Sequence, residues 1–200
     1  MDRQIIISLS REFGSGGHEI AEKLAAHYGL PLYDKNILTS IAKERDIDVD
    51  MLKKYDEKPR NLLFSRSVQG YSNSPEDNIA QMQFDYIKEK ADKGESFVLV
   101  GRCGDSILKD QPNLITIYVL GNPDARIARI ISRNRDLTEA EAKRLMEATD
   151  RKRRAYHNRY AQSKWGESAN YDLSIKSDPL GVDASAEVII QYIDRRPTVR

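Results

Sequence analysis

The sequence predicts an α/β fold in which a parallel sheet of five strands is covered by helices on both faces. Short, almost wholly apolar runs recur along the chain, as is typical of strands buried on both faces. Segments with apolar residues at three- and four-residue spacing lie between these runs and predict helices. The chain has 200 residues, enough for one full core, so we expect residues 1–200 to form a single domain.

The expected strands are the apolar runs, which are rich in β-branched residues. They cover residues 5–7, 30–34, 97–100, 114–120 and 171–176. The expected helices cover residues 20–28, 35–56 in two pieces, 74–93, 122 onward, 138–160 and 183–193. Capping residues mark four helix starts: Ser74, Asn122, a capping box from Thr138 to Glu141, and Asp183. Residues 57–74 lose all periodicity and predict a loop or insertion.

Composition narrows the class of protein. The net charge is +1, so no nucleic-acid partner is expected. No apolar run is long enough to cross a bilayer, so no membrane partner is expected either. The single cysteine, Cys103, rules out an internal disulfide and fits a reducing compartment. These observations predict a cytoplasmic protein.

A glycine-rich turn joins the first strand to the first helix. It contains Gly14, Gly16 and Gly17. A strand, a glycine turn and a helix N-terminus together present backbone N–H groups to an anion, so we interpret the turn as a phosphate-binding loop. A tight turn that needs glycine only for packing is the alternative.

The loop departs from the Walker A pattern G-x-x-x-x-G-K-[ST]. With Gly16 as the second glycine, Arg11 stands at the first glycine, Gly17 at the lysine and His18 at the hydroxyl residue. Arg11 could supply the missing cation, or it could simply pair with Glu12. His18 is a candidate phosphate donor or a partly exposed cap residue.

Charged residues follow two other strands at their carboxyl ends, where ligands bind to parallel sheets. Asp34 could hold magnesium, water or a ribose hydroxyl, or it could cap the following helix. Arg102 follows Gly101 directly after the third strand and would face the ligand edge. We therefore expect the glycine loop, Asp34 and Arg102 to converge on one site.

Arginines on two consecutive helices form the second pattern. Arg126, Arg129 and Arg133 lie on one face of their helix, and Arg151 and Arg154 repeat the spacing on the next. Guanidinium groups neutralise phosphate oxygens bidentately, as phosphoryl transfer requires. A solvated helix face with pairs such as Asp150–Arg154 is the alternative.

Several stretches resemble the cytidylate kinase-like family, a divergent relative of bacterial cytidylate kinases among the P-loop nucleoside monophosphate kinases. They are IIISLSREFGSGGHEIAEKLA, LPLYDKNIL, FVLVGRCGDSIL and DRKRRAYHNRY leading into NYDLSIKS. The resemblance implies a three-layer P-loop kinase fold with a small nucleoside-monophosphate-binding insertion over residues 35–75 and an arginine-bearing lid over residues 126–160. It also implies ATP and Mg²⁺ as cofactors.

The resemblance carries over residue by residue. The donor-phosphate loop is matched by Arg11, Phe13, Gly14, Ser15, Gly16, Gly17 and His18. Asp34 matches an acid near the acceptor nucleotide, and Arg102 matches the arginine that contacts the acceptor phosphate. Lid arginines are matched by Arg126, Arg129, Arg151 and Arg154, which with Arg11 and Arg102 are the expected catalytic residues.

The chain departs from the family's kinases at several positions. Glu19 replaces a small hydroxyl residue, Val100 an aspartate, Cys103 the aspartate of Gly-Arg-Asp, and Ser40 an acceptor-side arginine. Arg60 or Arg66 could substitute for that arginine. No metal ligand is assigned.

The leading hypothesis is transfer of the ATP γ-phosphoryl group to a nucleoside monophosphate, CMP or dCMP first. One alternative is a nucleotide-binding regulatory protein that has lost catalysis. Another is a kinase of a different small-molecule acceptor, selected by residues 57–74. Nucleotides are the expected partners, and self-association is left open.

Overall fold

The computed structural model describes residues 4–34, 36–46, 48–53, 67–68, 71–72 and 74–196. The strands are β1 (Ile6–Arg11), β2 (Leu32–Tyr33), β3 (Ser67–Val68), β4 (Tyr71–Ser72), β5 (Phe97–Val100), β6 (Leu114–Leu120) and β7 (Leu173–Lys176). The helices are α1 (Gly17–Tyr28), α2 (Ile37–Arg45), α3 (Val49–Lys53), α4 (Pro75–Asp92), α5 (Gly104–Ile107), α6 (Pro123–Arg133), α7 (Glu139–Tyr160) and α8 (Gly181–Arg195), with a 3₁₀ turn at Ser168–Asn170.

Five of the described strands form one parallel sheet in the order β2-β5-β1-β6-β7. β1 lies at the centre, hydrogen-bonded to β5 on one side and β6 on the other. The chain reverses direction across the sheet at this point, so the carboxyl end of β1 lies at a topological switch point, where such sheets bind ligands. The predicted five-stranded parallel sheet is confirmed.

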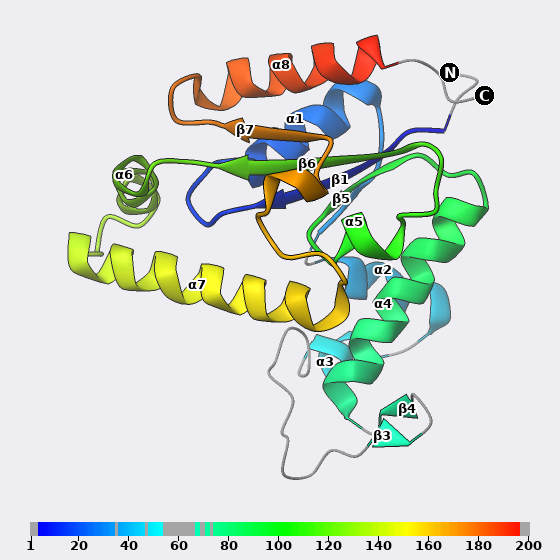
Figure 1. Cartoon of the computed structure of the whole chain (residues 1–200). Helices are drawn as coiled ribbons and strands as arrows, with labels where there is room; N and C mark the ends of the chain where they lie inside the picture. The colour runs from blue at the N-terminus through cyan, green and yellow to red at the C-terminus, as the bar shows by residue number, and fades with distance from the viewer. Residues whose placement is uncertain are drawn as a thin grey trace.

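Helices cover both faces because adjacent side chains in each buried strand point to opposite faces. Ile7 and Leu9 pack with α1 and α8 on one face. Ile6 and Phe97 pack with α2 and α4 on the other. Figure 1 shows α1 and α8 above the sheet and α2 and α4 below it. The three-layer arrangement predicted from the sequence is therefore confirmed.

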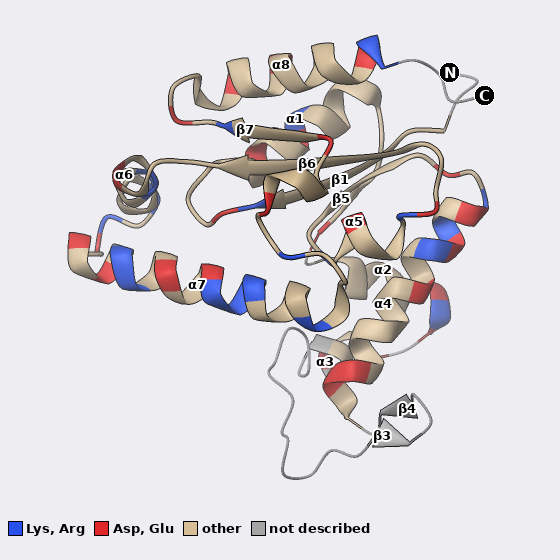
Figure 2. Ribbon diagram, viewed as in Figure 1, with Lys and Arg blue, Asp and Glu red and all other residues tan. Residues whose placement is uncertain are grey.

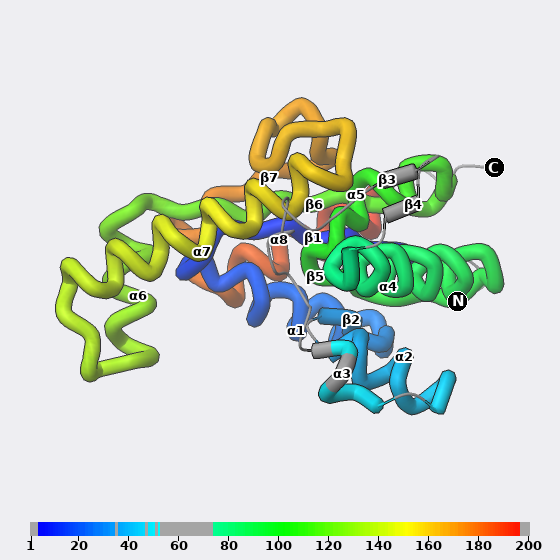
Figure 3. Tube along the Cα trace, turned by 90° about the horizontal axis from the view of Figure 1, so that it is seen from below, coloured from blue at the N-terminus to red at the C-terminus, as the bar shows by residue number. Residues whose placement is uncertain are grey.

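Helices α6 and α7 lie at the carboxyl edge of the sheet. α6 lies beyond the end of β6, and α7 runs back beneath the sheet (Figure 1). Seen from below, α6 lies at the opposite end of the molecule from α2 and α3 (Figure 3). Basic and acidic residues alternate along α7 (Figure 2). Only one face of this helix can turn toward the sheet, so its rotation decides which arginines reach the site.

Most helix starts lie where the sequence places them, but their caps differ. The capping box of Thr138 and Glu141 is present as predicted. Ser74 and Asn122 stand at N-cap positions, yet neither side chain accepts a backbone N–H of its helix. Asp183 does not cap α8, because that helix begins two residues earlier and Asp183 lies in its first turn, paired with Lys23.

Other differences concern which elements form and where they begin. The short helix α5 directly after β5 was not predicted. β7 begins two residues later than expected, at Leu173. Most of the 57–74 segment, with Arg60 and Arg66, lies outside the described residues.

Candidate phosphate site

The glycine turn connects β1 to α1 with two residues in the left-handed region, Gly14 at φ 82° and Gly16 at φ 79°. A Cβ on Gly14 would lie 2.8 Å from the Arg126 carbonyl oxygen of α6. One on Gly16 would lie 2.8 Å from Val182 Cγ2 of α8. The turn therefore packs tightly against both helices, as the packing interpretation requires. It also leaves the first N–H groups of α1 without intrahelical partners, as an anion site requires.

Ser15 has a structural place within the turn. Its hydroxyl donates to the Glu12 carbonyl oxygen at 2.9 Å. Its own carbonyl oxygen accepts from Ser177 Oγ at 2.6 Å, so the buried Ser15 ties the turn to the end of β7.

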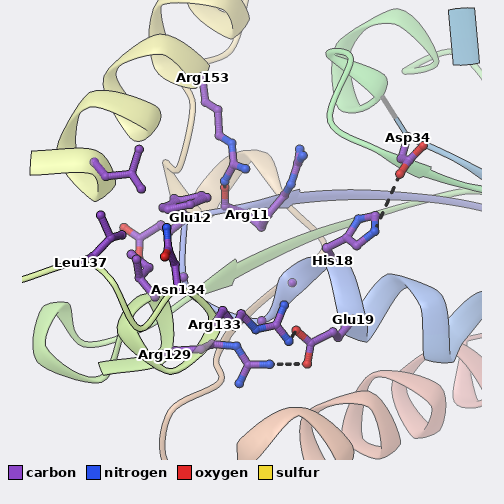
Figure 4. A pocket seen from close by; sticks show the side chains of 16 residues that line it. Arg11, Glu12, His18, Glu19, Asp34, Arg129, Arg133, Asn134, Leu137 and Arg153 are labelled. Atoms are coloured by element: carbon purple, nitrogen blue, oxygen red, sulfur yellow. Dashed lines mark hydrogen bonds and ion pairs between the residues drawn. The ribbon is translucent and has the colours of Figure 1, made fainter. Parts of the chain in front are cut away.

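A cavity of about 450 Å³ opens in front of the turn (Figure 4). Its walls come from the turn, the start of α1, α6 and α7. Of the residues predicted from the sequence, the cavity brings together Arg11, Phe13, Gly14, Gly16, Gly17, His18, Asp34 and Arg129. The predicted residues Ser15, Arg102, Arg126, Arg151 and Arg154 are not among its lining residues.

Arg126 is buried beneath the turn, with a side chain 7% exposed. Its Nη1 lies 3.1 Å from Glu12 Oε2, its Nη2 pairs with Asp150, and its Nε donates to the Phe13 carbonyl oxygen at 2.7 Å. A buried charge is tolerated when it is paired and hydrogen-bonded on all sides, as here. Arg126 thus stabilises the conformation of the loop. Its contact with a transferring phosphate stays a prediction.

Arg129 and Arg133 lie at the cavity wall, on α6. Both pair with the carboxylate of Glu19 in the first turn of α1 (Figure 4). A carboxylate near a helix N-terminus is favourable, and guanidinium groups bind it as they bind phosphate. In the free protein, Glu19 therefore provides the anion that these two arginines contact.

Asp34 lies at the far side of the cavity and is 6% exposed. Its Oδ1 accepts the Asn36 backbone N–H at 2.7 Å just before α2, but the N-cap residue of that helix is Asn36 and no described side chain caps it, so Asp34 shapes the turn and is not the helix cap. Its Oδ2 lies 3.7 Å from Nε2 of the exposed His18 and faces the cavity (Figure 4). One carboxylate thus performs a structural role and also faces the site.

Arg102 borders a second, much smaller cavity of about 30 Å³. Arg102 and Cys103 both adopt left-handed backbone angles, with φ 55° and 54°. Such angles cost free energy in residues other than glycine and cluster at functional sites. The two cavities share Arg11 and Arg153, so these side chains separate the expected acceptor side from the loop.

Arg153 is a lining arginine that the sequence analysis did not assign to the site. It donates from Nη1 to the Arg11 carbonyl oxygen at 3.1 Å, and its guanidinium lies 5.5 Å from the centre of the Phe13 ring. Arg151 and Arg154 are exposed, and Arg154 stacks on Trp165 instead. The sequence held a signal for Arg153. Ala142 and Met146 mark the inward face of α7, and helical spacing places Asp150 and Arg153 on that same face.

The end of α7 carries a second group that the sequence analysis missed. His157 Nε2 lies 2.8 Å from Asp105 Oδ2, and both side chains are buried. Ser163 Oγ donates to the same carboxylate oxygen at 3.2 Å. This pair fastens α7 to α5, the short helix that follows Arg102.

Trp165 and Tyr171 are buried, as expected for core residues, and pack around Tyr118. Burial raises the pKa of the Tyr171 hydroxyl to about 12. Among the described residues, no His, Cys, Asp and Glu cluster has the composition of a metal site. None of the helices described is long and apolar enough to cross a membrane.

Comparison with known proteins agrees with this geometry. The family description "Cytidylate kinase-like family" matches residues 6–179. The chain belongs to the cytidylate kinase-like family. No curated protein matched the sequence. Membership in this family supports phosphoryl transfer in general.

Solved structures give the same picture for this cytidylate kinase-like protein. An uncharacterized protein from Eubacterium ventriosum is 40% identical, with a TM-score of 0.76 over 96% of this chain and 100% of the other. Shikimate kinase from Bacteroides thetaiotaomicron is 12% identical, with a TM-score of 0.57 over 95% and 98% of the chains. A sugar kinase from Janibacter sp. is 13% identical, with a TM-score of 0.52 over 97% and 96%. The latter two similarities show the P-loop kinase fold.

Proposed function

We propose that this protein transfers the γ-phosphoryl group of ATP to a nucleoside monophosphate, with CMP or dCMP as the first candidates. The observation that carries the proposal is the cavity of about 450 Å³ between the glycine turn and the arginines of α6 and α7. Phosphoryl transfer needs positioning and charge neutralisation more than a covalent nucleophile, and this cavity offers both.

The position of each residue suggests which part of the substrates it would bind. The N–H groups at the start of α1 would bind the donor phosphates, since a helix N-terminus favours negative charge. Arg129, Arg133 and Arg153 would neutralise the transferring group from the opposite wall. Arg102 would hold the acceptor phosphate, and Asp34 would face the acceptor nucleoside.

Magnesium, when bound, would neutralise phosphate oxygens of the nucleotide. Glu12 and Glu19 are engaged with arginines, which leaves Asp34 as the cavity carboxylate with an oxygen toward the site. Mg²⁺ commonly needs only one or two carboxylates besides phosphate oxygens and water. The residues present therefore fit a metal that arrives with the nucleotide.

A second candidate function is a nucleotide-binding regulatory protein without turnover. The observation that favours it is the pairing of Glu19 with Arg129 and Arg133, which occupies two arginines that catalysis would use. Kinases of another small-molecule acceptor form the third possibility, because the sequence differs from cytidylate kinases around the acceptor site.

The deciding experiment is product formation followed by chromatography. The protein would be incubated with ATP, Mg²⁺ and one acceptor at a time: CMP, dCMP, UMP, AMP, GMP and shikimate. CDP formation that is lost in Arg102→Ala supports the proposal. ATP binding measured by calorimetry, with no ADP formed from any acceptor, would favour the regulatory function. Product from an acceptor other than CMP or dCMP would retain the kinase and change its substrate.

A further inference from the structure

Gly17 stands where a Walker A loop has its lysine, and the structure shows why a side chain is absent there. A Cβ on Gly17 would lie 2.6 Å from Arg11 Cβ and 3.1 Å from Arg11 Cγ. Gly17 is not among the glycines with positive φ, so its backbone angles do not require glycine. The space that a lysine stem would use is filled by Arg11.

Arg11 is the last residue of β1, and its side chain crosses from the glycine turn to the neighbouring strand. Its Nη1 lies 2.5 Å from the position that a Cβ on Gly101 would take, at the end of β5. Arg11 therefore runs from Gly17 at its stem to Gly101 at its head. Figure 4 shows its side chain between those of Arg153 and His18.

The position of the Arg11 head is suited to phosphoryl transfer. Arg11 lines both the large cavity before the glycine turn and the small one that Arg102 borders. A guanidinium group at that boundary can hydrogen-bond oxygens of two phosphates at once, through its several N–H donors. In transfer, the bond from the γ-phosphorus to the β–γ bridging oxygen breaks, with its electron pair leaving on ADP. A new bond forms from phosphorus to an acceptor phosphate oxygen, while the guanidinium stays protonated.

We infer that the glycine and the cation of the Walker A loop have exchanged positions in this protein. Arg11 stands at the first Walker glycine and supplies the cation, while Gly17 stands at the lysine and supplies the space. This inference rests on the proposed function, and it identifies Arg11 as the catalytic residue that replaces the lysine between donor and acceptor phosphates.

The test reverses the exchange. Arg11→Gly removes the cation and is expected to lower kcat for phosphoryl transfer by about 10²-fold or more. Arg11→Gly combined with Gly17→Lys restores the Walker pattern at both positions and is expected to recover most of that loss. Guanidinium ion at millimolar concentration should also partly rescue Arg11→Gly. Arg144→Ala, at an exposed arginine of α7, is the matched control.

Each outcome bears on the inference. Unchanged kcat in Arg11→Gly, with an active native protein, overturns it and leaves the proposed function intact. A loss that neither the added Gly17→Lys substitution nor guanidinium ion restores overturns it as well, provided that circular dichroism and ATP calorimetry show a folded, nucleotide-binding variant. If the native protein transfers no phosphoryl group to any acceptor, the proposed function fails first and the inference falls with it.

Discussion

The backbone N–H of Phe13 in the glycine turn donates a 2.7 Å hydrogen bond to Oδ1 of Asp150 in α7. The other oxygen of that carboxylate pairs with the buried Arg126. One side chain of α7 thus fixes both the backbone of the phosphate loop and the arginine beneath it. Movement of α7 as a lid would disturb the loop that it covers.

This arrangement predicts that Asp150→Ala both destabilises the fold and weakens nucleotide binding. The substitution leaves the buried Arg126 with Glu12 as its carboxylate partner and removes the acceptor of the Phe13 N–H, so the free energy of unfolding should fall by about 2 kcal/mol. Urea denaturation measures this change, and calorimetry measures the Kd for ATP. Glu147→Ala, at an exposed position of the same helix, should change neither value. Wild-type stability in Asp150→Ala would mean that Glu12 alone suffices for Arg126.

Substitution of Arg153 should lower the rate of phosphoryl transfer more than substitution of Arg151 or Arg154, the two arginines chosen from sequence spacing. Arg153→Ala removes a guanidinium from the cavity wall and is expected to lower kcat by about 10²-fold. Arg151→Ala and Arg154→Ala remove exposed groups and should leave kcat close to the native value. Steady-state rates of the three variants, measured at saturating ATP, make the comparison. A larger loss in Arg151→Ala would restore the sequence-based assignment.

Glu19→Gln tests whether Glu19 competes with phosphate for Arg129 and Arg133. Both arginines would then be available to the nucleotide, so the Kd for ATP should fall. The change should be about two- to fivefold, because a partly exposed ion pair contributes about 1 kcal/mol or less. Calorimetry measures the Kd, and Glu187→Gln on α8 is the control. A higher Kd together with a lower kcat would instead identify Glu19 as a residue that positions the arginines.

Stability should decline between pH 10 and pH 12, in part through Tyr171. Burial raises the pKa of its hydroxyl from 10.0 to about 12 in the folded protein. The contribution of Tyr171 is therefore fully present below pH 10 and is lost as pH rises through the folded pKa, because the unfolded chain releases its proton first. Urea denaturation across this range should show a shallower decline for Tyr171→Phe. An identical decline in both proteins would contradict the role of Tyr171.

The sequence by itself determined the strands of the parallel sheet, the longer helices and the edge at which the site lies. Apolar runs such as 114–120 and the capping box at Thr138 depend on local pattern, and the structure confirms both. The glycine turn and Asp34 were also predictable, because carboxyl ends of parallel strands meet at one edge. Residues 126–160 contain most of α6 and all of α7, as a helical lid region would, and the lid and insertion boundaries stay predictions.

Only the tertiary structure decided which charged side chains face the cavity. Spacing placed Arg126 and Arg154 with the other arginines, but the rotation of each helix buries Arg126 and turns Arg154 toward Trp165. The same rotation turns Arg153 toward the loop, since a helix presents each side chain according to its packing against distant segments. The steric dependence of Gly17 on Arg11 likewise arises across the turn. Such contacts form between residues of different elements, and a local sequence pattern carries no information about them.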